Sequence, residues 1–262
     1  MFTKSDILKD LYILDIPKDS IVTVHTSLKA VGEIEGGGEA LLEALIEAFA
    51  QGDGVLAIPT HTWDSDVYDR RNNDSCIGTL PRLAAGHINA VRTLHPTHSM
   101  AVFGNKERVV KFVENEAIAD TPANPNGCYG KLLKENGYIL LIGVGQDKNT
   151  FIHCVEEMMK VPNRLTKNKV KKTIVYKDGS REERELLWFD DTLVDDVSVN
   201  FPKFEAPFRY HNCIRDGKVG NAKVQICSSK GIKDTLELIY KRNNFQELLS
   251  DDKPLSKKLY EE

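Results

Sequence analysis

Two spacings of apolar residues alternate along the chain. Residues 39–50 place Leu41, Leu45 and Phe49 about one helical turn apart, which is the pattern of a helix with one buried face. Residues 138–145, YILLIGVG, form a continuous apolar run, as in a strand that is covered on both faces of a sheet. The alternation of such segments predicts an α/β protein.

Caps, turn residues and β-branched runs set the bounds of the other predicted elements. We expect helices over residues 5–14, 39–50, 80–89, 107–116, 150–159 and 232–242, and strands over residues 21–28, 54–60, 99–104, 138–145, 170–177, 185–190 and 219–228. The polar stretch that follows residue 60 carries Trp63 and Tyr68, so we interpret it as an ordered loop.

The last third of the chain differs in its turn chemistry. Asp178-Gly179 lies between the apolar stretches 170–177 and 185–190, and this dipeptide is a strong signal for an antiparallel hairpin. Because strand–helix units come before the hairpin, we expect a mixed central sheet between helices. With no repeat and no low-complexity linker, residues 1–262 are interpreted as a single domain.

Charge and hydropathy narrow the function classes. The 262 residues contain 35 Lys and Arg against 39 Asp and Glu, a net charge of −4, whereas a dedicated nucleic-acid binder usually carries a basic excess. No apolar run reaches the roughly 18 residues of a membrane span, and the first ten residues lack the apolar region of a signal peptide. We therefore expect a soluble cytoplasmic protein with no nucleic-acid or membrane partner.

The cysteines and histidines are scattered. Five cysteines without a C-x-x-C pair indicate free thiols in a reducing compartment, and neither H-E-x-x-H nor paired cysteines suggest a metal. Cys154 follows His153, so a cysteine nucleophile activated by the histidine is one interpretation. Side chains adjacent in sequence usually point apart, and a buried thiol is the commoner state of such a cysteine.

Two polar segments lie at predicted strand ends. His25-Thr26-Ser27-Leu28 closes one strand, and three glycines from Gly36 then precede a helix, an arrangement that can bind phosphate at the helix N-terminus or serve simply as a flexible connection. Residues 95–99, HPTHS, precede another strand. They are either a turn that satisfies its own backbone or one wall of a ligand cleft.

A third segment follows the apolar run 138–145. If residues 150–159 are helical, Glu156 and Glu157 lie three and four positions after His153, so either carboxylate can approach the imidazole. Asp147 is a further candidate partner. A carboxylate beside a histidine raises its basicity and suits a general base at neutral pH. The alternative is an ordinary helix with a semi-buried histidine and solvated acids.

Taken together, these segments resemble the aminoglycoside 3-N-acetyltransferase family, also called the antibiotic N-acetyltransferase family. The resemblance rests on an ordered series of motifs: H-T-S-L at 25–28, V-G-x-x-x-G-G at 31–37, P-T-x-T-W at 59–63, H-P-T-H-S at 95–99, L-L-I-G-V-G at 140–145, N-T-x-x-H-x-x-E at 149–156 and G-K-V-G-N-A-K-V at 217–224. The chain departs from the family pattern in the turn 121–130, where Asn126-Gly127 replaces Ser-Pro, and in the loop 60–79.

The resemblance implies a layered α/β/α fold, distinct from the GNAT acetyltransferases, and acetyl transfer from acetyl-CoA to the 3-amino group of a 2-deoxystreptamine aminoglycoside. It makes His153 the catalytic base with Glu156 in support. It also implies that the coenzyme is bound by His25, Thr26, Ser27, Leu28, Val31, Gly32, Gly36, Gly37 and Ser99. Direct attack of the amine needs no acetyl-enzyme.

A cationic acceptor would be met by acidic side chains near these motifs. Asp64, Asp66 and Glu157 are the candidates for acceptor binding, with Asp69 on the same loop, although such an acidic loop is more often merely solvated. Two other functions are alternatives: an N-acetyltransferase of a cell-surface or metabolic amino sugar, and a non-catalytic CoA-binding relative. A homodimer is left open.

Overall fold

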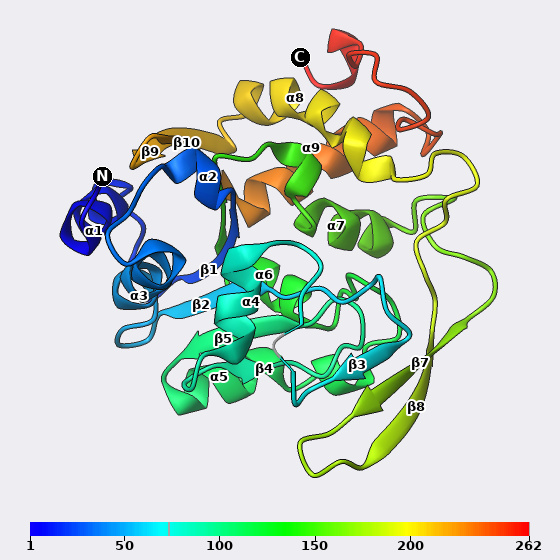
Figure 1. Ribbon diagram of the computed structural model, residues 1–262. Coiled ribbons are helices and arrows are strands. Elements are labelled where there is room, and N and C mark those ends of the chain that lie inside the picture. Colours follow the sequence, from blue (N-terminus) through cyan, green and yellow to red (C-terminus); the bar gives the residue numbers. More distant parts are fainter. Residues whose placement is uncertain (73, 262) are drawn as a thin grey trace.

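The computed structural model describes residues 1–72 and 74–261, and its centre is a mixed sheet (Figure 1). The order of its strands is β4 (Val91–Arg92), β5 (Met100–Gly104), β2 (Val55–Pro59), β1 (Ile21–Thr26), β6 (Tyr138–Ile142), β10 (Ala222–Ser228) and β9 (Ile214–Val219). β1 runs parallel to β2 and β6, and every other pairing in this sheet is antiparallel. The predicted mixed sheet is confirmed.

Alternation along the strands divides the core into two layers. In β6, Leu140 and Ile142 face one side of the sheet, while Ile139 and Leu141 face the other, and all four are fully buried. The first side is covered by α1 (Lys4–Ile13), α3 (Gly37–Phe49) and α4 (Thr79–Gly86). The second is covered by α5 (Lys106–Val113), α6 (Cys128–Lys134), α7 (Phe151–Met159) and α9 (Ser229–Arg242) (Figure 1).

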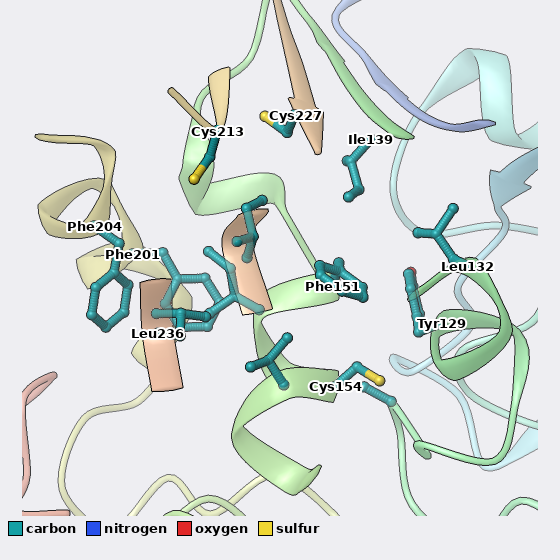
Figure 2. Packing of buried hydrophobic residues seen from close by; sticks show 14 of the residues in the cluster. Tyr129, Leu132, Ile139, Phe151, Cys154, Phe201, Phe204, Cys213, Cys227 and Leu236 are labelled. Carbon is teal, nitrogen blue, oxygen red and sulfur yellow. The ribbon is translucent and has the colours of Figure 1, made fainter. Parts of the chain in front are cut away.

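The layer that holds α7 is the more aromatic one. Figure 2 shows Phe151 of α7 near Ile139 of the sheet and near Tyr129 and Leu132 of α6, with Cys154 one turn further along α7. These side chains are buried, and removing the apolar surface of each large one from water stabilises the fold by on the order of 2 kcal/mol. This packing fixes α7 against the sheet, and the layered α/β/α fold is confirmed.

The predicted hairpin is present, but it does not join the central sheet. β7 (Val170–Val175) and β8 (Arg181–Leu186) form a separate three-stranded sheet with β3 (Val67–Asp69), which pairs in parallel with β7 (Figure 1). The second strand begins at Arg181, four residues earlier than predicted. The long polar loop thus contributes a strand of its own, because Tyr68 is buried there.

Other boundaries also differ from the predictions. The first strand ends at Thr26, since Ser27 caps the short helix α2 (Leu28–Val31). The segment 219–228 contains a turn after which β10 begins, and the preceding strand β9 was missed, as were η3 (Val197–Phe204) and α8 (Glu205–Tyr210). Three short 3-10 helices complete the structure: η1 (Glu116–Ile118), η2 (Gln146–Lys148) and η4 (Lys257–Leu259).

Candidate functional site

A cleft of about 880 Å³ opens at the carboxyl ends of the three parallel strands. His25 and Thr26 end β1, Pro59 ends β2, and Val144 follows β6. This is the edge of an α/β sheet at which ligands usually bind. One further wall comes from the start of α4, with residues 77, 78, 80 and 81. Another comes from two segments that follow the hairpin, residues 188–191 and 195–198.

Buried imidazoles gather around this cleft. Four of them line it: His25, His61, His98 and His153. The rings of His61 and His98 lie 4.3 Å apart between centroids. Burial lowers the pKa of His25 to about 4, with a smaller effect of the Lys148 charge, and burial also lowers the pKa of His61 and His98 well below the usual range. At neutral pH the cleft therefore presents uncharged imidazoles.

His153 lies where α7 meets the cleft. Its ring stacks on Phe189 at 4.1 Å and meets the edge of Phe201 at 4.7 Å, so the two aromatic rings fix its orientation. Nδ1 is buried without a hydrogen-bond partner, while Nε2 is neither bonded nor enclosed among the described residues and faces the cleft. Burial lowers the pKa of His153 to about 3, against the opposing charge of Asp196, so the ring is neutral and can accept a proton.

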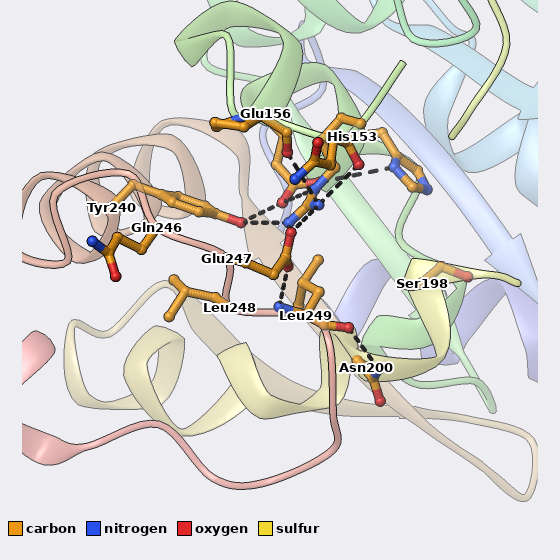
Figure 3. A network of polar contacts seen from close by, with 12 residues as sticks. His153, Glu156, Ser198, Asn200, Tyr240, Gln246, Glu247, Leu248 and Leu249 are labelled. Carbon is orange, nitrogen blue, oxygen red and sulfur yellow. Dashed lines mark hydrogen bonds and ion pairs between the residues drawn. The ribbon is translucent and has the colours of Figure 1, made fainter. Parts of the chain in front are cut away.

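Glu156 is the carboxylate that faces His153. Its Oε2 lies 4.0 Å from His153 Nδ1, too far for a hydrogen bond, and has no other partner in residues 1–72 and 74–261. Its Oε1 accepts hydrogen bonds from Arg164 Nε at 2.9 Å and from the Tyr240 hydroxyl (Figure 3). The helical spacing thus predicted this proximity, while nothing in the spacing pointed to Arg164 or Tyr240.

The other two candidate partners of His153 are engaged elsewhere. The Glu157 carboxylate accepts hydrogen bonds from the Thr121 hydroxyl and, at 3.0 Å, from the backbone N–H of Ala123. Burial raises the pKa of Glu157 to about 7. Asp147 lines the cleft and forms an ion pair with Lys148 at 3.0 Å.

The residues of the first motif that the resemblance assigned to the coenzyme do not all lie in the cleft. His25 and Thr26 line the cleft, and the Thr26 hydroxyl is buried without a partner. Ser27 accepts a hydrogen bond from the N–H of Ala30 and caps α2. Val31 and Gly32 contact the turn between β9 and β10, away from the cleft-lining residues.

The glycine-rich loop leads into the N-terminus of α3. Gly36 and Gly37 have φ angles of +79° and +61°, and a side chain at Gly37 would meet no atom within 4 Å. The next glycine, Gly38, lies against Leu28 of the first motif and Thr79 of α4. Because the following residues of α4 line the cleft, the loop lies beside that rim.

The HPTHS segment fits both interpretations. His95 Nδ1 accepts hydrogen bonds from the N–H groups of Thr97 and His98, which closes a turn, and Ser99 is fully buried with its hydroxyl donating to the carbonyl of Thr60 at 2.9 Å. Only His98 of this segment lines the cleft. Ser99 therefore supports the wall from behind, without lining the cleft.

The acidic side chains in the cleft are not those that the sequence singled out. Asp64 and Asp66 lie outside its lining, and Asp66, which is 88% exposed, forms an ion pair with Lys172 at 2.8 Å. Besides Asp147, which is paired with Lys148, four acids line the cleft and form no ion pair within the described residues: Asp190, Asp191, Asp195 and Asp196. The run WFDDTLVDD at 188–196, which places acids beside aromatic residues, is the signal that could have identified them.

The cysteine thiols are not suited to nucleophilic attack. All five cysteines are free; Cys154 is fully buried, and burial raises the pKa of its thiol well above the usual range, so it is not a ready nucleophile. Across residues 1–72 and 74–261, no three His, Cys, Asp or Glu side chains are arranged to bind a metal ion. Within the same residues no helix has the length and apolarity needed to cross a bilayer.

Comparison with known proteins places this geometry in a family. The YokD protein of Bacillus subtilis (strain 168), an aminoglycoside N(3')-acetyltransferase-like protein of a prophage, is 25% identical, with 92% of this chain and 93% of YokD covered. Among solved structures, aminoglycoside acetyltransferase AAC(3)-IVa with a histidine replaced by alanine and gentamicin bound superposes with a TM-score of 0.77, at 23% identity and 94% and 92% coverage. AAC-IIIb with CoASH gives 0.74, at 18% identity and 92% and 97% coverage.

Both structural matches support the fold that the strand order shows. The family model described as Aminoglycoside 3-N-acetyltransferase matches residues 23–240, which extend from the first strand of the cleft to the last helix of the core. The match includes every wall of the cleft. The chain therefore belongs to the aminoglycoside 3-N-acetyltransferase family, and it is an acyltransferase of that type.

Proposed function

We propose that this protein transfers the acetyl group of acetyl-CoA to an amine of an aminoglycoside, the 3-amino group of a 2-deoxystreptamine ring, with His153 as general base. One observation carries the proposal: Nε2 of a neutral, aromatic-clamped imidazole faces a cleft with four unpaired aspartates in its wall. A structural relative holds CoASH and another holds gentamicin, which gives the two ligand classes a precedent in this fold.

In the proposed reaction, His153 accepts one proton from the acceptor amine. The neutral form of the acceptor amine attacks the thioester carbonyl and forms the new C–N bond, while His153 Nε2 takes a proton from that nitrogen. The C–S bond then breaks, and the coenzyme thiolate takes that proton from the imidazolium. General-base catalysis of this kind typically contributes 10²–10⁴-fold. Glu156 Oε2, across from Nδ1, favours the tautomer with the proton on Nδ1 and stabilises the imidazolium that forms.

The tetrahedral intermediate carries an oxyanion that needs a donor. Thr26 lines the cleft, and its buried hydroxyl has no hydrogen-bond partner among the described residues, so we assign it this role. A single donor of this kind typically lowers the barrier by about 3 kcal/mol. Direct attack on the thioester remains our mechanism.

We assign the two ligands to different ends of the cleft. The pyrophosphate of the coenzyme would lie at the N-terminus of α3, where the space beside Gly37 is open and the helix dipole favours an anion. Among the residues of the first motif, Ser27 and Leu28 would shape this end. The polycationic acceptor would lie against the aspartates of residues 190–196.

The remaining parts of the proposal concern the whole protein. Both core clusters cover faces of one sheet, which supports one N-acetyltransferase domain over residues 1–262. We also propose a cytoplasmic location and, if the acceptor is an aminoglycoside antibiotic, a role in resistance to it. Homodimerisation stays a prediction.

A thiol-release assay tests the proposal. Purified protein is mixed with acetyl-CoA and with a panel of 2-deoxystreptamine aminoglycosides and simple amino sugars, and free CoA is followed. We expect release with the aminoglycosides. Release with amino sugars alone would keep the mechanism and replace the acceptor, and CoA binding without release for every amine would favour a non-catalytic relative.

A further inference from the structure

The carboxylate beside His153 is held by a buried ion network. Arg164, whose side chain is 3% exposed, donates from Nε to Glu156 at 2.9 Å and from Nη1 and Nη2 to the two Glu247 oxygens at 2.9 and 3.1 Å. Tyr240 of α9 donates to the same Glu156 oxygen (Figure 3). None of Arg164, Tyr240 or Glu247 lines the cleft, so none of them is placed to touch a substrate.

The network joins the site to the segment that follows α9. Glu247 lies beyond residue 240, where the match to the family model ends. Asn200 of η3 donates to the carbonyl of Leu249 at 2.9 Å, and Lys203 donates to the carbonyl of Asp251 at 2.7 Å, so η3 fixes this segment in place. η3 also contributes to the cleft wall.

The charges of the network suit the reaction that we assign to His153. Glu156, Arg164 and Glu247 carry −1, +1 and −1, which sum to −1 before proton transfer; when His153 becomes an imidazolium, the four groups sum to zero. Burial raises the pKa of the Glu156 carboxyl, whereas the charge of Arg164 and its hydrogen bond to Oε1 favour the ionised form. A protonated Glu156 could not stabilise the imidazolium.

We propose that Arg164, anchored by Glu247, is a positioning residue of the acetyl transfer: it keeps Glu156 ionised and aimed at His153 Nδ1. This inference rests on the proposed role of His153 as base. Arg164 acts through Glu156 and takes no proton itself. The titratable groups around Glu156 are Glu157, Arg164, Tyr240 and Glu247. Those around His153 are His61, His98, Asp196 and Arg164, and the charge of Arg164 itself lowers the pKa of His153, so its support of the base acts through Glu156.

The decisive variants remove opposite charges from the network. Arg164→Met leaves Glu156 to its burial, so we expect kcat at pH 7 to fall about 100-fold and to recover at least tenfold by pH 9 as Glu156 ionises. Glu247→Gln leaves Arg164 with a single carboxylate, so we expect a roughly tenfold loss of kcat that is uniform between pH 6 and pH 9. KM for both substrates should stay within about twofold, since the cleft lining is untouched.

Controls separate positioning from packing. Arg164→Lys keeps the charge and should restore the pH profile, and Asp252→Asn removes one exposed acid from the same C-terminal segment and should change nothing. Infrared difference spectra between Arg164→Met and Arg164→Met/Glu156→Gln should show a protonated carboxylic acid at pH 7. If Arg164→Met does not fold, the flat profile of Glu247→Gln and the unchanged KM values still carry the test.

The possible failures are distinguishable. Full activity of His153→Gln would overturn the proposed base and with it this inference. If His153→Gln is inactive, the base assignment stands and two results would overturn the positioning role alone. One is a wild-type kcat in Glu247→Gln. The other is a loss of kcat in Arg164→Met that is the same at every pH and comes without an infrared band of a protonated carboxylic acid.

Discussion

The two walls of the cleft are built in different ways. The sheet wall consists of strand ends, with His25 and Thr26 in register beside β6, and its backbone is fixed by parallel pairing on both sides. The opposite wall consists of residues 188–198, which precede and enter η3, and the four aspartates there form no ion pair within the described residues. We therefore infer that the first wall holds the reacting groups in place, whereas the second recognises charge.

Phe189 links the two walls. Its ring stacks on His153, while Trp188 beside it lies 6.0 Å from the ring of His98. In the proposed function, the wall that would meet the acceptor would thus also orient the base. The predictions that follow separate catalysis, acceptor binding and coenzyme binding, in order of expected effect.

Replacement of His153 should have the largest effect. In His153→Gln the side chain can no longer take a proton, and we expect kcat to fall 10²–10⁴-fold with little change in KM, because the aromatic clamp and the aspartates remain. The measurement is the rate of thiol release at saturating substrates. His87→Gln is the matched control, since His87 lies outside the cleft and pairs with Glu43; equal losses in the two variants would contradict the assignment.

Neutralising the acidic wall should act on binding. In Asp191→Asn/Asp195→Asn we expect KM for a polycationic aminoglycoside to rise about tenfold and kcat to change less than twofold, because two long-range attractions are removed while the reacting groups stay in place. The increase should shrink at high salt, where charges are screened. A monoamine acceptor should show little change, and Asp252→Asn, at an exposed site, is the control.

A methyl group at the glycine loop tests the coenzyme end. Gly37→Ala and Gly179→Ala both add a side chain at a positive φ, +61° and +85°, and neither new Cβ meets an atom within 4 Å. Both variants should therefore lose similar stability, on the order of 1 kcal/mol. Only Gly37→Ala should also raise KM for acetyl-CoA, by several-fold, because a bound pyrophosphate would occupy that space; equal KM values would argue against the proposed site.

The same contrast explains what the sequence could predict. Apolar periodicity identified most of the central strands, and the i, i+3 spacing on α7 placed Glu156 beside His153, because both depend on local geometry. The parallel pairing of β3 with β7 and the position of Arg164 depend on chain segments that meet only in the folded protein. Local pattern therefore found the sheet wall and missed the acidic one.

The smallest effect should come from the acid that the sequence favoured for acceptor binding. Asp66 is almost fully exposed, lies outside the cleft lining and is paired with Lys172. An exposed ion pair of this kind contributes little, so Asp66→Asn should leave KM for the aminoglycoside within about twofold. The comparison with Asp191→Asn under the same conditions is direct, because each removes one negative charge. If Asp66→Asn raised KM as much as Asp191→Asn, the loop 60–79 would have to reach the acceptor, and the acidic wall would extend beyond residues 190–196.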